Sequence, residues 1–233
     1  MQIDEVHALL DSPDVATTWL KPLGITDPRT AHANLTRLAV AGIPLDLMGI
    51  ICQQFAEIAP KLADPDMALN NLERFLQSAR SPLAMAALFE RDPDSLPNLL
   101  VMLNCSQSFS DQLCTDPESY ELLRTTRGRP VSRDLLVEEL VRSIEPVQEE
   151  DAAMKALRRF KRRETLRIAY GDIVGQLPVA QVTRQISYLA DALVDAALQF
   201  AVGYHLRKRE HRNGQPQSGP KIVVLALGKL GGL

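Results

Sequence analysis

Apolar positions recur along most of the chain at three- and four-residue intervals, which place apolar side chains on one face of an α-helix. The clearest case runs from about Pro178 to Lys208 and predicts one helix of about 30 residues and about 45 Å. A second long helix is predicted from about Gln148 to Tyr170, with an acidic first turn and a strongly basic middle. The predicted inward face of the first of these helices consists of Val182, Ile186, Leu189, Leu193, Ala197, Phe200 and Tyr204.

Residues 1–127 show shorter helical patterns separated by a recurrent start signal. A capping Asp or Ser is followed by proline, which suits the first helical position because the N–H it lacks has no partner there. The signal stands at Asp64-Pro65, Ser81-Pro82, Asp92-Pro93 and Asp116-Pro117. Because its spacing is irregular, no repeat of fixed length is predicted. We therefore expect an irregular helical array in residues 1–127 and a helical lead-in with two long helices in residues 128–212.

The last stretch, residues 213–233, has a different pattern. A polar segment precedes the apolar, β-branched run from Ile222 to Leu227, and glycines follow, which predicts a buried strand ending in a tight turn. Glycines directly after a strand let backbone N–H groups approach a phosphate closely. The spacing of these glycines matches neither the Walker A loop nor the GxGxxG fingerprint. The candidate nucleotide-binding residues are Gly228, Lys229, Gly231 and Gly232.

Composition narrows the class of protein. Of the 233 residues, 45% are apolar and 5% are aromatic, and the formal net charge is −3. This balance gives no general drive to bind nucleic acid or an anionic membrane. The N-terminus has no secretory signal pattern, and no apolar run approaches the roughly 20 residues of a membrane span. We expect a mainly α-helical, cytoplasmic protein.

Side chains suited to catalysis are sparse. Cys52, Cys105 and Cys114 have no paired spacing, and the four histidines form no metal-ligand pattern. We therefore assign no catalytic residue and no metal ligand within this sequence. The basic run from Arg158 to Arg163 has two interpretations: a face that binds phosphate or nucleic acid, or a solvated helix face with acid–base pairing.

Two separate stretches together resemble the glutamine synthetase adenylyltransferase family. The first comprises Leu157–Glu164, Leu166–Ala169, Asp172 and Leu189–Ala192, and the second, Val223–Gly232, resembles that family's first nucleotidyltransferase strand and glycine turn. The resemblance implies that an α+β nucleotidyltransferase domain starts at the end of this sequence. It also implies transfer of AMP from ATP to a tyrosine of glutamine synthetase, removal of that AMP by phosphorolysis, and Mg²⁺ held by an Asp-x-Asp pair. Glutamine synthetase and a PII-type signalling protein are the implied partners.

Because the chain begins at Met1 and reaches one such motif, the resemblance implies the N-terminal, adenylyl-removing half of the enzyme. No Asp-x-Asp follows the glycines before Leu233, so we expect a truncated nucleotidyltransferase domain and a chain that is inactive alone. Productive binding of ATP or AMP and Mg²⁺ by this chain is then not expected. Two alternatives stay open: a non-catalytic helical module that binds a partner protein, and nucleic-acid binding through the basic helix.

Overall fold

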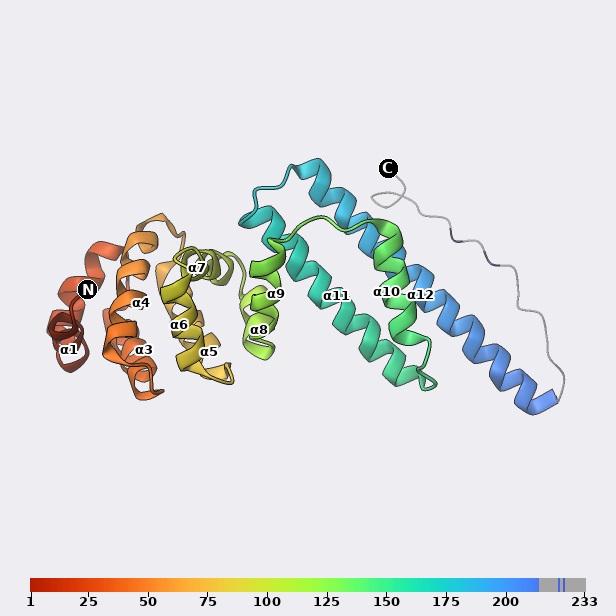
Figure 1. The fold of residues 1–233 in the computed structure, drawn as a ribbon, viewed down its shortest axis with the longest axis horizontal. Helices are drawn as coiled ribbons and strands as arrows, with labels where there is room; N and C mark the ends of the chain where they lie inside the picture. Colours follow the sequence, from red (N-terminus) through yellow and green to blue (C-terminus); the bar gives the residue numbers. More distant parts are fainter. Residues whose placement is uncertain (214–221, 223, 225–233) are drawn as a thin grey trace. The chain divides into compact units, whose positions relative to one another are not determined.

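The computed structural model describes residues 1–213 together with Ile222 and Val224, and it confirms the mainly α-helical class (Figure 1). Twelve α-helices and two short 3₁₀ helices, Lys21–Leu23 and Ala59–Lys61, make up the secondary structure of this described part. The chain forms two compact units, Met1–Thr126 and Arg127–Leu233. The predicted glycine turn, and the predicted strand apart from Ile222 and Val224, lie outside the described residues.

The first unit is an array of short helices in which α5 packs against α3, α7 and α8, while α4 packs against α1, α6 and α7. Its core includes the fully buried Phe55, Phe75 and Phe89. Phe75 meets Tyr120 edge to face, with ring centroids 6.1 Å apart. The helices are α1 (Ile3–Asp11), α2 (Pro13–Leu20), α3 (Pro28–Val40), α4 (Leu45–Ile58), α5 (Pro65–Ser78), α6 (Pro82–Arg91), α7 (Ser95–Cys105), α8 (Gln107–Thr115) and α9 (Ser119–Thr126).

Two of the four predicted helix starts are confirmed because the capping side chain binds the first turn. The Asp64 carboxylate accepts a hydrogen bond from the Met67 N–H at 2.8 Å at the start of α5. The Ser81 hydroxyl accepts one from the Ala84 N–H at 3.1 Å at the start of α6. These bonds satisfy donors that the helix itself leaves unpaired.

The other two predicted helix starts are wrong, because a short turn precedes each helix. α7 begins at Ser95 and α9 at Ser119, two residues after the prolines that were expected to begin them. The hydroxyls of these serines donate to the backbone carbonyls of Asp92 and Asp116 at 2.8 and 2.7 Å. The carboxylate of Asp92 binds Arg124 instead of capping a helix, at 2.8 Å.

In the second unit, the described residues form α10 (Arg133–Ile144), α11 (Glu150–Ile173) and α12 (Val179–Asn213). α12 packs along both α10 and α11 (Figure 1). Both long helices predicted from the apolar pattern are confirmed, with somewhat later ends. The buried core of this unit consists of Leu136, Leu140, Ile144, Leu157, Phe160, Ile168, Leu189, Ala192 and Ala196.

The face that α12 buries differs from the predicted one. Gln185, Leu189, Ala192 and Ala196 are buried, whereas Ile186 is 51% exposed. Small alanine side chains let neighbouring helices approach closely, so the buried stripe follows them rather than the larger apolar side chains. Packed at the edge of this core are Leu193, Ala197 and Phe200.

The segment Val179–Arg209 of α12 is long and apolar enough, by length and composition alone, to cross a membrane, which the sequence prediction missed. Between Arg184 and Arg207 its Asp, Glu, Lys or Arg residues are Asp191 and Asp195. Both carboxylates pair with Arg133 of α10. In this structure α12 is therefore the central helix of a packed three-helix unit.

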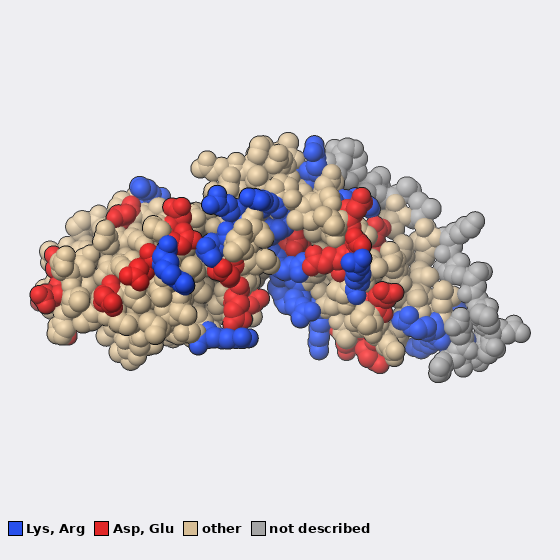
Figure 2. Space-filling view, viewed as in Figure 1, with Lys and Arg blue, Asp and Glu red and all other residues tan. Residues whose placement is uncertain are grey.

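Charge is divided unevenly between the two units. Residues 1–126 contain 8 Lys or Arg and 17 Asp or Glu, a net charge of −9. Residues 127–233 contain 18 Lys or Arg and 12 Asp or Glu, a net charge of +6. The overall value of −3 hides this division. Within the second unit, Lys and Arg side chains gather along α11 (Figure 2).

Candidate functional site

The residues predicted to bind nucleotide, Gly228, Lys229, Gly231 and Gly232, lie outside the described residues and stay predictions. The other stretches that carried the family resemblance, 157–172 and 189–192, lie in α11 and α12 and are fully described. The candidate site is therefore built from α11, α12 and the segment that leads into α10.

The basic run of α11 is divided between the interior and the surface. Phe160 is 6% exposed and packs in the core, and the guanidinium of Arg163 lies 4.9 Å from the centre of its ring. Arg163 also binds Glu139 of α10 at 2.7 Å and Glu164 at 3.0 Å. Acid–base pairing, one of the two interpretations of this run, therefore holds for Arg163.

One turn further along α11, Arg167 is the centre of a buried polar network. Its exposed fraction is 7%, and its guanidinium donates to the Glu164 carboxylate at 2.7 Å, the Gln185 amide oxygen at 2.8 Å and the Arg129 backbone carbonyl at 2.6 Å. Gln185 in turn accepts from the Val131 N–H and donates to the Val131 carbonyl, both at 2.9 Å. The network thus ties α11, α12 and the segment before α10 together, with its charge and most of its donors satisfied.

The same segment touches α11 through glycine. Gly128 has a φ of +63°, and a β-carbon added there would fall 2.3 Å from the backbone nitrogen of Gly171. A β-carbon at Gly171 would fall 2.6 Å from the Gly128 carbonyl oxygen. Two backbones therefore meet at a distance that no larger residue permits, and Arg127 before them also has a positive φ of 53°.

A second polar link joins α10 to α12. Arg133 binds Asp191 at 2.8 Å and Asp195 at 2.9 Å, so one guanidinium bridges two carboxylates one helical turn apart. The hydrogen bond to Asp191 is the main cause of a raised pKa for Arg133. Together with the ion pair between Arg163 and Glu139, polar contacts therefore join the three helices of this unit at three places.

Comparison with known proteins bears on this unit directly. A model of the glutamate–ammonia ligase adenylyltransferase family matches residues 96–233, which is more than half of the chain. This chain belongs to the glutamate–ammonia ligase adenylyltransferase family. It is also 29% identical over 238 residues to the bifunctional glutamine synthetase adenylyltransferase/adenylyl-removing enzyme of Pseudomonas putida. That alignment covers 94% of this chain and 24% of the relative, so the chain spans about a quarter of the relative's length.

The region that matches the adenylyltransferase family begins in α7 and includes all of α10, α11 and α12. The predicted family is confirmed, and the Arg167 network lies wholly inside the matched region. Sequence reasoning missed Gln185 and Arg133 as parts of the site. A signal for Gln185 was present, because it is the one polar position in the helical series completed by Leu189, Ala192 and Ala196.

Cys52, His7 and His32 make structural contacts. Cys52 is fully buried, and burial raises the pKa of its thiol to about 12, which disfavours the reactive thiolate. His7 pairs with Asp11 at 2.9 Å on the surface, and the His32 ring contacts the Leu10 carbonyl at 2.9 Å. Within residues 1–213, no group of three His, Cys, Asp or Glu is arranged to hold a metal ion.

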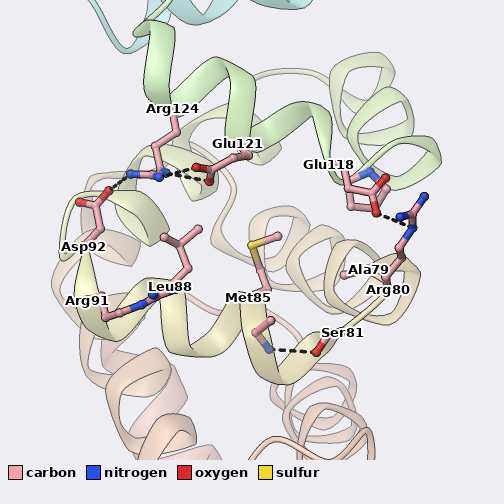
Figure 3. Close-up of a pocket in the computed structure, with 12 residues that line it drawn as sticks. Ala79, Arg80, Ser81, Met85, Leu88, Arg91, Asp92, Glu118, Glu121 and Arg124 are labelled. Carbon is pink, nitrogen blue, oxygen red and sulfur yellow. Dashed lines mark hydrogen bonds and ion pairs between the residues drawn. The ribbon is translucent and has the colours of Figure 1, made fainter.

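A groove of about 610 Å³ lies in the first unit between α6 and the start of α9 (Figure 3). Two of its three arginines are paired with carboxylates: Arg124 binds Asp92 at 2.8 Å and Glu121 at 2.6 Å, and Arg80 binds Glu118 at 2.8 Å. The third, Arg91, donates to the Ala87 backbone carbonyl at 3.2 Å. Because three carboxylates balance the three arginines of the lining, the groove has no net charge that would favour an anion. Between the two sets of ion pairs the lining is apolar and includes Met85 and Leu88.

Proposed function

We propose that this chain forms the helical part of an enzyme that transfers AMP to and from a tyrosine of glutamine synthetase, and that it serves the adenylyl-removing reaction. Membership of the family supports the nucleotidyl-transfer chemistry. The Pseudomonas putida relative is named for both adenylyl transfer and adenylyl removal. The assignment to removal is supported by the order of the sequence stretches, in which the helical lead-in precedes one nucleotidyltransferase strand and turn.

The observation that carries the proposal is the buried network of Arg167, Glu164 and Gln185 within the family-matched region. It fixes α11 against α12, and α12 then continues without interruption to Asn213, which precedes the predicted strand in the sequence. Nucleotidyl transfer requires the attacking oxygen and the phosphate to be held in line, and small misplacements are costly. A stiff support for the domain that carries the glycine motif is what this reaction requires.

We further propose that Gly228, Lys229, Gly231 and Gly232 contact ATP or AMP when they belong to a whole nucleotidyltransferase domain, and that Mg²⁺ serves the reaction there. When bound, Mg²⁺ would neutralise negative charge on the phosphate groups of the nucleotide. The described residues do not themselves fit a Mg²⁺ site, because they hold no suitable group of three ligands. No step of the reaction is therefore assigned to a metal held by these helices. A PII-type protein as a second partner, and a cytoplasmic location, belong to the same proposal.

The test is a chimera in which this chain replaces the aligned segment of the Pseudomonas putida relative. We expect a folded chimera to add AMP to glutamine synthetase and to release it in the presence of phosphate. Arg167→Met should reduce release about 10- to 100-fold while AMP addition changes little, because the helical support is displaced. Arg142→Met is the matched control, since Arg142 makes a surface ion pair with Glu138 on α10.

Thermal melting of each variant separates loss of folding from loss of activity. If Arg167→Met removed AMP addition and spared release, the adenylyl-removing assignment would be wrong. A folded chimera with neither activity would contradict the proposed function as a whole.

The alternative of a protein-binding module is favoured by one observation, the exposed cations of α11. Arg158 and Arg159 make no ion pair with any residue that the structure describes. Binding and catalysis are compatible in one chain, and the next subsection develops this feature.

A further inference from the structure

Four exposed cations share one side of α11: Lys155, Arg158, Arg159 and Arg162. They stand at positions i, i+3, i+4 and i+7, so they cover an arc of about 100° and a length of about 10 Å along the helix. None of them makes an ion pair or hydrogen bond with a residue in the described part of the chain. We call these four residues the α11 basic face.

The lack of partners distinguishes this face from four other arginines of the same three-helix unit. Arg133, Arg142, Arg163 and Arg167 are each bound by at least one carboxylate. Like charges three or four residues apart destabilise a helix, so the α11 basic face weakens α11 rather than strengthening it. Packing within the unit therefore does not account for these side chains, whereas binding an acidic partner does.

Two observations favour an acidic protein surface over nucleic acid as that partner. Phe160, the aromatic residue of the run, is buried in the core and offers no ring on which a base could stack. The exposed Glu149, Glu150 and Asp151 stand at the start of the same helix, so a phosphate backbone lying along α11 would meet like charge within two turns. A compact acidic patch avoids them, and guanidinium groups bind its carboxylates in a two-pronged geometry.

The position of the face connects it with the proposed reaction. α11 packs against α12, and α12 precedes the predicted nucleotide-binding turn in the sequence. A protein substrate held on α11 would be anchored to the same rigid unit that supports the reacting groups.

We propose that the α11 basic face docks an acidic patch on the surface of glutamine synthetase. This inference rests on the proposed function, because that function names the protein substrate. It adds the surface of this chain that receives the substrate and the charge of the surface that is recognised. Opposite charges across such an interface raise the association rate, and this effect weakens with salt.

The test measures direct binding of the purified 233-residue chain to glutamine synthetase from Pseudomonas putida, in both unmodified and adenylylated form, at three salt concentrations. Arg158→Glu together with Arg159→Glu should weaken binding about tenfold or more and flatten its salt dependence. Arg184→Glu together with Arg207→Glu is the matched control, because these two arginines of α12 are also exposed and free of ion pairs with described residues. The control should bind within about twofold of the unaltered chain. Arg158→Lys together with Arg159→Lys, which keeps the charge, should retain most of the binding.

Several outcomes would overturn the docking proposal. An equal loss of binding in Arg158→Glu/Arg159→Glu and in the control Arg184→Glu/Arg207→Glu would indicate a general charge effect. Unchanged binding of Arg158→Glu/Arg159→Glu would exclude the α11 basic face as the docking surface. Tighter binding to duplex DNA or to phosphatidylserine vesicles would assign the face to another class of partner. Self-association at low salt that Arg158→Glu/Arg159→Glu abolishes would assign it to a second copy of this chain. Circular dichroism melts confirm that each variant is folded.

The two proposals fail independently. If the chimera transfers AMP but the chain does not bind glutamine synthetase, docking is wrong and the proposed function stands. If binding depends on Arg158 and Arg159 but a folded chimera neither adds nor removes AMP, the docking surface stands and the catalytic proposal is wrong.

Discussion

Gly128 and Gly171 meet backbone to backbone, and a β-carbon on either would lie 2.6 Å or less from a main-chain atom of the other. Gly128 also has a φ of +63°, a conformation that other residues adopt with strain. The segment that enters α10 is therefore held against α11 at a point where side chains are excluded. The polar contacts of Arg167 with the Arg129 carbonyl lie next to this point.

Replacing Gly171 with alanine should destabilise the protein by about 1–3 kcal/mol, because the clashing atoms are backbone atoms that move only with the whole segment. Gly203→Ala is the matched control in α12, where the nearest atom is the end of the flexible Arg207 side chain at 3.3 Å. That change should stabilise the protein by about 0.5–1 kcal/mol, because alanine favours the helix. Urea unfolding measures both values, and a neutral Gly171→Ala would contradict the close contact.

Arg167→Met should cost about 3–5 kcal/mol of stability, because it leaves the buried Glu164 carboxylate without its main partner. The double variant with Glu164→Leu should be less destabilised than the sum of the single variants, by about 1–3 kcal/mol. A double-mutant cycle in urea measures this coupling. Additive effects would show that the two side chains do not depend on each other.

Asp64→Ala and Asp116→Ala test the capping difference within one sequence signal. Both aspartates are exposed and precede proline, but the Asp64 carboxylate binds the first turn of α5 while that of Asp116 makes no such bond. We expect a loss of about 1 kcal/mol for Asp64→Ala and less than about 0.5 kcal/mol for Asp116→Ala. Thermal melts at neutral pH distinguish these values, and equal losses would argue against the assigned caps.

The loss of stability at acid pH should depend in part on the protonation of Asp27. Its hydrogen bond from the Thr30 hydroxyl is the main cause that lowers the pKa of Asp27 below the usual 3.8. A lowered pKa means that the stabilisation is present above pH 3.8 and is lost as the pH falls further through the folded-state pKa. Asp27→Asn should therefore flatten the fall of the melting temperature below about pH 4. An unchanged acid limb in the variant would count against this contribution.

The order in which the three cysteine thiols are labelled at pH 8 should follow how deeply each is buried. Cys105 is exposed and should react first with iodoacetamide, while Cys114 is half-buried with a raised pKa and should react more slowly. Cys52, with a pKa of about 12 and no exposed surface, should react only after unfolding. Mass spectrometry of timed samples gives the order, and early labelling of Cys52 would show that the first unit opens readily.

Local signals predicted much of this fold because their causes are local. The cap at Asp64 depends on atoms three residues away, and the lengths of α11 and α12 follow from the spacing of their own apolar residues. The start of α7 was misplaced because Asp92 is bound by Arg124, which lies in another helix. No pattern near Asp92 reveals that competitor.

The candidate site was less predictable, since its contacts join residues far apart in the sequence. Arg167 binds Gln185 and the Arg129 carbonyl, and these contacts exist only once three segments have packed. The basic run illustrates the same limit. The sequence of the run does not distinguish Arg163, which is paired with Glu139, from Arg158, which has no partner among the residues described.

Because α12 is one uninterrupted helix, the direction in which the chain leaves it depends on the number of residues in the helix. Each residue inserted into or removed from α12 turns everything beyond it by about 100° about the helix axis and shifts it by about 1.5 Å. A single insertion after Phe200 would therefore aim the following chain at a different side of the three-helix unit, although every contact of Gln185, Leu189 and Ala192 would survive. The number of residues in α12, rather than the identity of its outer residues, thus sets the direction in which the chain leaves the helix.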